Sequence, residues 1–125
     1  MTDLKNKSFA ARLRFALAGL AHALAAERSV RTHLLALAAV VAALLYLRPA
    51  PVWWALILLT SSTVIAAELF NTALETLADH LHPERHPQIR IVKDCAAAAV
   101  LVLALGALCV AAALLMSLIA AGPRA

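Results

Sequence analysis

The chain has 125 residues, of which 64% are hydrophobic and only 14% are charged, and its formal net charge is +4. Typical globular domains are about half apolar and about a quarter charged, and a protein this small has too little interior to hide so many Ala, Leu and Val side chains from water. The composition therefore excludes a disordered chain, a collagen and a disulfide scaffold. It predicts a single integral membrane domain over residues 1–125.

The first predicted element is a helix over residues 8–29, with Ser8 as its candidate N-cap. Arg12 and Arg14 lie off the apolar side of this helix. We expect an amphipathic helix that lies in the headgroup layer of the membrane, with its apolar side toward the lipid chains. The apolar residues recur at helical spacing and are Phe9, Leu13, Leu17, Leu20 and Leu24.

Three long runs without a charged residue follow this surface helix. They contain 16 residues from Thr32 to Leu47, 19 from Pro49 to Ala67 and 29 from Cys95 to Pro123. A helix needs roughly 20 largely apolar residues to cross the hydrocarbon core, so the predicted fold is all-α, with a surface helix and three transmembrane helices. The segment between the last two spans contains Pro83 and Pro87 and is predicted to be a loop. The expected spans cover about 31–47, 52–79 and 89–121.

The basic residues predict the orientation of these spans. Nine of the eleven lie before the first span or between the second and the third, and only Arg48 and Arg124 lie on the other side. The positive-inside rule therefore places the N-terminus and the second loop in the cytoplasm. The first 31 residues carry six basic residues and the apolar run begins late, so a signal peptide is not expected. No basic cluster is interleaved with stacking aromatics, so a nucleic-acid partner is not expected either.

One face of the second span is polar near its cytoplasmic end. Lipid does not tolerate such a face, so we expect it to look into a protein cavity or a subunit interface. A chain with only three spans is expected to need other subunits to enclose it. The polar residues fall inside a stripe roughly 100° wide and are Glu68, Asn71, Thr72, Glu75 and Asp79.

Glu68 and Glu75 lie about 10 Å apart along the helix axis, too far to share one small cation. They could flank a nucleoside triphosphate with magnesium, because Mg²⁺ is typically held by one or two carboxylates together with phosphate oxygens and water. Lys93 and Asp94 enter the third span at the same depth and add a cation for phosphate and another carboxylate. The alternative is that these residues only cap helix ends and snorkel to water.

Three histidines of the second loop, His80, His82 and His86, raise a metal site as a further alternative. Their spacing is not one that fixes metal ligands on one face of a helix, so a solvated loop or nucleotide contacts are favoured. Familiar nucleotide-binding motifs such as G-x-x-x-x-G-K-[ST] do not occur in the sequence.

Two other classes of protein remain open. A small ion-coupled transporter would use Glu68 and Glu75 to carry protons or cations, but it has no use for Lys93 and Asp94. A membrane adaptor that docks a partner through its N-terminal helix would leave the acidic stripe unexplained.

The run Glu68-Leu-Phe-Asn71-Thr-Ala-Leu-Glu75, followed by Asp79 and Lys93-Asp94, closely resembles the signature of the prokaryotic diacylglycerol kinase family, which includes the undecaprenol kinases. Upstream, Glu27-Arg28-Ser-Val-Arg31-Thr-His33 is similar to the first segment of that family. The resemblance implies a small lipid kinase of the bacterial inner membrane that uses ATP and magnesium. It also implies a homotrimer with active sites between subunits.

The resemblance also implies roles for individual residues. Glu68 would be the catalytic base that takes the proton of the lipid hydroxyl, Glu27 and Glu75 would hold magnesium and ATP, and Asn71 would orient this face. The other implied ATP contacts are Phe15, Glu84, His86, Lys93 and Asp94.

The lipid acceptor stays open between diacylglycerol and undecaprenol. Arg31 and His33 are expected near the lipid. The diacylglycerol-specific branch often has an acid where this chain has His33, and Arg31-Thr-His33-Leu-Leu is closer to the undecaprenol-kinase pattern.

Overall fold

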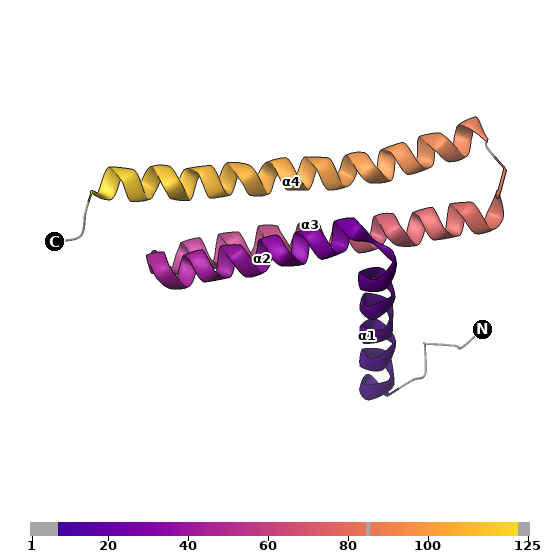
Figure 1. Ribbon diagram of the computed structural model, residues 1–125, viewed down its shortest axis with the longest axis horizontal. Coiled ribbons are helices and arrows are strands. Elements are labelled where there is room, and N and C mark those ends of the chain that lie inside the picture. The colour runs from indigo at the N-terminus through magenta and orange to yellow at the C-terminus, as the bar shows by residue number, and fades with distance from the viewer. Residues whose placement is uncertain (1–7, 85, 123–125) are drawn as a thin grey trace.

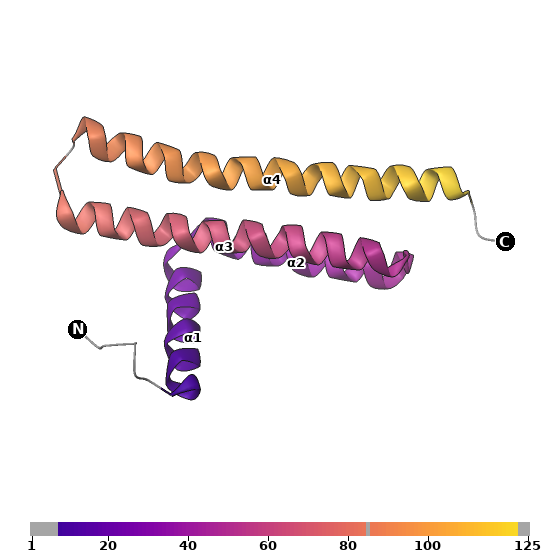
Figure 2. The same ribbon diagram turned by 180° about the vertical axis from the view of Figure 1, so that it is seen from behind.

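The computed structural model describes residues 8–84 and 86–122, and this part of the chain forms helices joined by short links. The helices are α1 (Phe9–Ala26), α2 (Arg28–Leu47), α3 (Pro51–Leu81) and α4 (Pro87–Ala121). Helices α2, α3 and α4 run alongside one another, whereas α1 projects crosswise from the start of α2 (Figures 1 and 2). Helix α3 packs against both α2 and α4 and is therefore the central element.

The surface helix ends earlier than predicted. Ser8 caps α1 as expected, because its hydroxyl accepts a hydrogen bond from the backbone N–H of Ala11 at 3.4 Å. The predicted end at residue 29 is wrong: α1 stops at Ala26, Glu27 adopts an extended backbone (φ −106°, ψ 123°) and α2 begins at Arg28. This one extended residue turns the chain from α1 into α2.

Arg31 stabilises the junction of α1 and α2. Its guanidinium donates hydrogen bonds to the carbonyl oxygens of Leu24 and Ala25, at 2.8 and 3.1 Å. The last carbonyls of a helix have no partner within the helix, so a cation at this end satisfies them and also interacts favourably with the helix dipole.

Helix α3 extends beyond its predicted bounds at both ends, and helix α4 begins before its predicted start. Each has a proline in its first turn, Pro51 and Pro87, where the missing N–H costs nothing. His86 caps α4, since its Nδ1 accepts a hydrogen bond from the backbone N–H of Gln88 at 3.2 Å. At 1.5 Å per residue, the 31 residues of α3 extend about 46 Å. That exceeds the hydrocarbon thickness of about 30 Å, so a part of α3 must lie outside the hydrocarbon core.

Four helices among the described residues are long and apolar enough to cross a membrane, by length and composition. The sequence pattern predicted three spans, and α1 is the fourth candidate. Its crosswise direction in Figure 1 favours a position along the membrane surface when α2, α3 and α4 cross the bilayer.

A small apolar core joins the three side-by-side helices α2, α3 and α4 near the α2–α3 turn. Leu44 of α2, Ile57 of α3 and Leu114 of α4 are buried against one another, and Trp53 and Trp54 pack on this cluster. Most other large apolar side chains are exposed in the single chain, as lipid-facing or subunit-facing residues would be.

Candidate functional site

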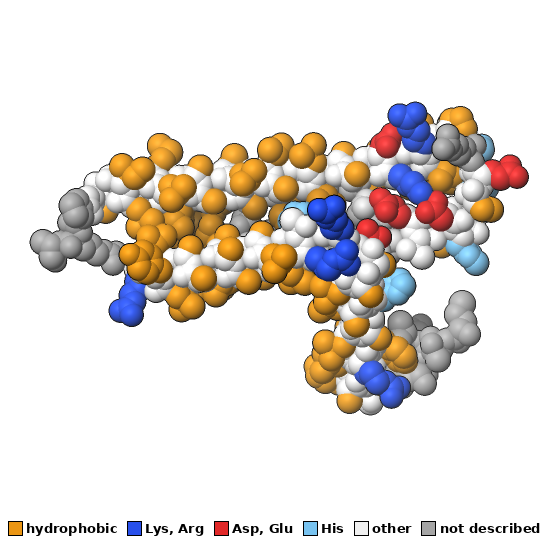
Figure 3. Space-filling view, in the orientation of Figure 1, with side chains coloured by type: hydrophobic (Ala, Val, Ile, Leu, Met, Phe, Trp, Pro, Cys, Tyr) orange, Lys and Arg blue, Asp and Glu red, His pale blue; other side chains and the backbone are white. Residues whose placement is uncertain are grey.

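The polar end of the molecule lies where α1 meets α2 and where α3 turns into α4. Charged side chains gather there, while the long apolar part of the bundle shows almost only hydrophobic side chains on the same face (Figure 3). The helix ends that the sequence predicts to be cytoplasmic thus lie toward one end of the bundle.

Glu68 is the acidic residue that the fold buries most. It is 5% exposed and lies where α3 packs against α2. Its two carboxylate oxygens meet two different side chains of α2: the hydroxyl of Ser29 donates to Oε2 at 2.8 Å, and Nδ1 of His33 lies 3.1 Å from Oε1. A buried carboxylate needs such partners, because an isolated charge in an apolar environment is very costly.

The rest of the stripe divides between different neighbours. Thr72 is buried at 7% exposure, and Asn71 donates a hydrogen bond from Nδ2 to Oε1 of Glu75 at 3.0 Å, one turn along the same helix. The expectation that one chain cannot enclose the stripe is therefore wrong for Glu68 and Thr72. Both are covered within a single chain, since α2 packs against α3 and α1 lies against the C-terminal half of α3.

Asp79, at the far end of the stripe, faces α4 and forms an ion pair with Lys93. The next residue of α4, Asp94, lies 3.5 Å from the guanidinium of Arg90, one turn earlier in the same helix, in an exposed pair. Exposed pairs of this kind contribute little stability, typically about 0–1 kcal/mol. Their charges therefore remain available to a ligand at low cost.

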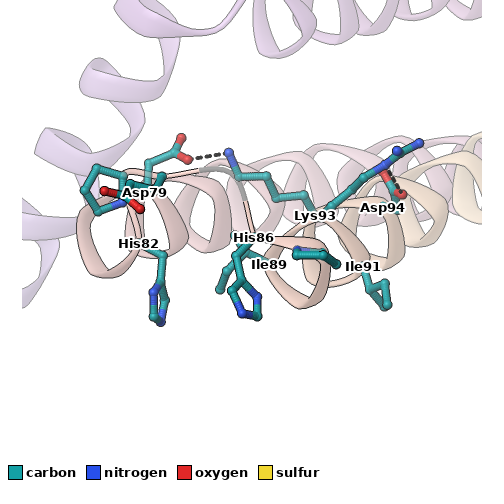
Figure 4. Close-up of a pocket in the computed structure, with 11 residues that line it drawn as sticks. Asp79, His82, His86, Ile89, Ile91, Lys93 and Asp94 are labelled. Carbon is teal, nitrogen blue, oxygen red and sulfur yellow. Dashed lines mark hydrogen bonds and ion pairs between the residues drawn. The ribbon is translucent and has the colours of Figure 1, made fainter.

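An open cavity of about 870 Å³ lies over the turn between α3 and α4. Four residues that the family resemblance places near ATP line it, together with Asp79: Glu84, His86, Lys93 and Asp94. His82 and His86 point to one side of this region, and the Asp79–Lys93 pair lies on the other (Figure 4). The volume is within the usual range of ligand pockets, about 300–1,000 Å³.

The remaining predicted residues do not line this cavity in the single chain. Phe15 is half-buried on α1, with the Arg14 guanidinium 5.7 Å from its ring centre. Glu27 is half-buried in the link between α1 and α2, and its side chain makes no capping hydrogen bond. Arg31 caps α1 and His33 contacts Glu68, which places His33 beside the predicted base.

The donors near Asn71 suit magnesium better than they suit a transition metal. Oδ1 of Asn71 is buried without a hydrogen-bond partner among the described residues, while Nδ2 of the same amide donates to the Glu75 carboxylate. Carboxylate and amide oxygens are hard ligands of the kind that Mg²⁺ takes. No group of three His, Cys, Asp or Glu side chains that could hold a metal is found in residues 8–84 and 86–122. The ring centroids of His82 and His86, two of the three loop histidines, lie 5.9 Å apart, and the two ring planes are tilted relative to each other.

One residue of this region was not singled out from the sequence: Ser29, which contacts Glu68. Asp79 was named in the stripe and in the family signature but was given no role of its own, and it pairs with Lys93. A signal for Ser29 did exist, because Ser29 and His33 are four residues apart and so share one face of α2.

Comparison with known proteins decides the family. A model of the prokaryotic diacylglycerol kinase family matches residues 14–115 of the chain. The chain belongs to the prokaryotic diacylglycerol kinase family. A diacylglycerol kinase of Synechocystis sp. is 39% identical to this family member over 104 residues, which are 82% of this chain and 59% of the relative. The chain thus spans less than two thirds of that relative's length. The family match confirms the resemblance noted from the signature residues.

Proposed function

We propose that this member of the diacylglycerol kinase family is a lipid kinase that transfers the γ-phosphate of ATP to the hydroxyl of a membrane lipid alcohol. The observation that carries the proposal is the buried Glu68, held by two side chains of α2 within a helix apolar enough to cross a membrane. Intramembrane ionisable residues are functional by default, and here the family supplies the reaction class.

Glu68 is the proposed general base. The hydroxyl oxygen of the lipid attacks the γ-phosphorus, its proton passes to the Glu68 carboxylate, and the bond between the γ-phosphorus and the bridging oxygen of ADP breaks. A positioned base typically contributes about 10²- to 10⁴-fold to such a rate. The rest of the rate enhancement in phosphoryl transfer comes from positioning and charge neutralisation.

The cavity over the α3–α4 turn is the proposed place of the nucleotide. Lys93 and the N-terminus of α4 supply positive charge for phosphate oxygens. Nδ1 of His86 accepts a backbone hydrogen bond, so a neutral His86 carries its proton on Nε2 and can donate it to a phosphate oxygen. Glu84 and Asp94 complete the proposed contacts, and Phe15 is proposed to approach the nucleotide from α1.

Magnesium is the proposed metal, with Glu27 and Glu75 as its carboxylate ligands. Bound there, Mg²⁺ would neutralise charge that develops on the phosphate oxygens. Asn71 holds the Glu75 side chain through the hydrogen bond from its Nδ2. Its proposed role is to orient that carboxylate toward the metal.

The inner face of the bacterial cytoplasmic membrane is the proposed location, with the N-terminus in the cytoplasm. ATP then arrives from the cytoplasm and the lipid alcohol from the leaflet, so no hydrophobic substrate has to leave the bilayer. A homotrimer with sites between subunits is the proposed assembly, and Arg31 is proposed to lie near the lipid headgroups while it caps α1.

The test is phosphate transfer from labelled ATP in mixed micelles that contain Mg²⁺ and either diacylglycerol or undecaprenol. We expect label in one lipid, with undecaprenol favoured by His33 in the Arg31-Thr-His33 segment. Label in neither lipid, with the protein folded, would refute the kinase. Proton-dependent flux in vesicles without ATP would then identify an ion-coupled transporter.

A further inference from the structure

We propose that Ser29 and His33 together position the carboxylate of Glu68, so that α2 supplies two positioning residues for the reaction. This inference rests on the proposed role of Glu68 as base. Ser29 and His33 lie one turn apart on α2, and each meets a different oxygen of the Glu68 carboxylate, at 2.8 and 3.1 Å.

The hydrogen-bond partners of His33 settle which of its nitrogens carries a proton. Nδ1 lies 3.0 Å from the backbone carbonyl oxygen of Ser29 and 3.1 Å from Oε1 of Glu68. A backbone carbonyl only accepts, and an ionised carboxylate only accepts, so Nδ1 must be the N–H that both share. In the neutral ring the proton is therefore on Nδ1, and that N–H donates to Glu68.

Two donors on two oxygens fix the plane of the carboxylate. A glutamate side chain has three rotatable bonds, and a single hydrogen bond would leave the carboxylate free to turn about it. With Ser29 on Oε2 and His33 on Oε1, each oxygen is held while one of its lone pairs remains for a proton from a substrate. General bases act only within hydrogen-bond reach of that proton, and a misplacement of about 1 Å can cost about 10² in rate.

The burial of the Glu68 side chain supports a positioning function for Ser29 and His33. The Glu68 side chain is 6% exposed and that of His33 29% exposed, so the carboxylate is enclosed mainly by the two helices that carry the three residues. Water is therefore a poor competitor for these hydrogen bonds, and the geometry is set by packing of α2 on α3.

The test compares His33→Ala with His33→Asn in the full chain. In asparagine the amide nitrogen occupies nearly the place of Nδ1 and can donate the same hydrogen bond, but nothing replaces Nε2. We expect His33→Ala to lower kcat for lipid phosphorylation by about 10- to 100-fold with an unchanged KM for ATP. We expect His33→Asn to recover kcat to within about threefold of the wild-type value.

Ser29→Ala tests the second donor, and Thr32→Ala is its matched control. Thr32 is on the same helix, but its hydroxyl donates to the carbonyl oxygen of Arg28 in its own helix and not to Glu68. We expect Ser29→Ala to lower kcat by about three- to tenfold, the effect of one neutral hydrogen bond, and Thr32→Ala to leave it unchanged. This pair also keeps the inference testable if His33→Ala does not fold.

Three outcomes would overturn the inference, and they are distinguishable. Wild-type kcat in both His33→Ala and Ser29→Ala would show that neither residue positions the base. A His33→Asn variant as slow as His33→Ala would assign the effect to Nε2 and not to the Nδ1–H contact. Absence of lipid phosphorylation by the folded wild-type protein would instead remove the proposed function itself, and the inference with it.

Discussion

At the scale of single residues, the most informative change is Glu68→Gln. Glutamine keeps the size of the side chain and an oxygen that can accept from Ser29, but it cannot take a proton from a lipid hydroxyl. We expect kcat for lipid phosphorylation to fall by about 10²- to 10⁴-fold, the usual contribution of a general base. Steady-state kinetics in mixed micelles measure this, and a variant with the wild-type rate would show that another group is the base.

Glu75→Gln addresses the proposed metal. The substitution removes a carboxylate charge while leaving an oxygen beside Asn71, so the proposed ligand set is weakened and the fold is retained. We expect the concentration of Mg²⁺ needed for half-maximal activity to rise about tenfold, which corresponds to about 1.4 kcal/mol. A magnesium titration that superimposes on that of the wild type would contradict Glu75 as a ligand.

Lys93→Gln separates phosphate binding from the ion pair with Asp79. We expect the KM for ATP to rise about tenfold, because hydrogen bonds to charged groups contribute about 1.5–3 kcal/mol. Asp79→Asn breaks the same ion pair but keeps the cation, so its effect on KM should be smaller. Equal effects of the two variants would mean that the ion pair, and not phosphate binding, is what Lys93 provides.

At the scale of elements, the joint between α1 and α2 depends on Arg31. Its removal leaves the carbonyls of Leu24 and Ala25 without this partner. We expect Arg31→Ala to destabilise the last turn of α1 by about 1 kcal/mol. Amide hydrogen exchange in that turn should then be about fivefold faster, because the opened state is populated about fivefold more. Exchange in α3 should be unchanged and serves as the internal control. Unaltered exchange in α1 would show that the cap contributes nothing.

At the scale of the whole molecule, the exposed apolar faces and the half-buried Asn71–Glu75 pair fit the proposed homotrimer. We expect light scattering in detergent to give three times the chain mass of 13.2 kDa. Small residues on α4 permit close helix contact, and a Cβ at Gly106 meets nothing within 4 Å in the single chain. Gly106→Leu should therefore weaken assembly without lowering helix content. A trimer as stable as the wild type would place this face against lipid.

The sequence alone was sufficient to predict which segments form helices and to recognise the family. Charge-free runs located α2, α3 and α4, helical periodicity located α1, and Pro83 and Pro87 predicted the turn before α4. These features are local, because a helix in lipid must satisfy its own backbone and be apolar over a fixed length. The end of α1 was missed, since it depends on one extended residue, Glu27, and on a distant side chain, Arg31.

The sequence by itself determined that Glu68, Asn71, Glu75 and Asp79 share a stripe of one helix, because the helical period fixes which residues point the same way. Only the tertiary structure decided what each of them meets: Glu68 faces α2 and is buried, whereas Asp79 faces α4 and pairs with Lys93. Periodicity carries no information about the neighbour across a helix interface. That choice is made by the packing of α2 and α4 against α3, which encloses the Glu68 carboxylate where Ser29 and His33 meet it.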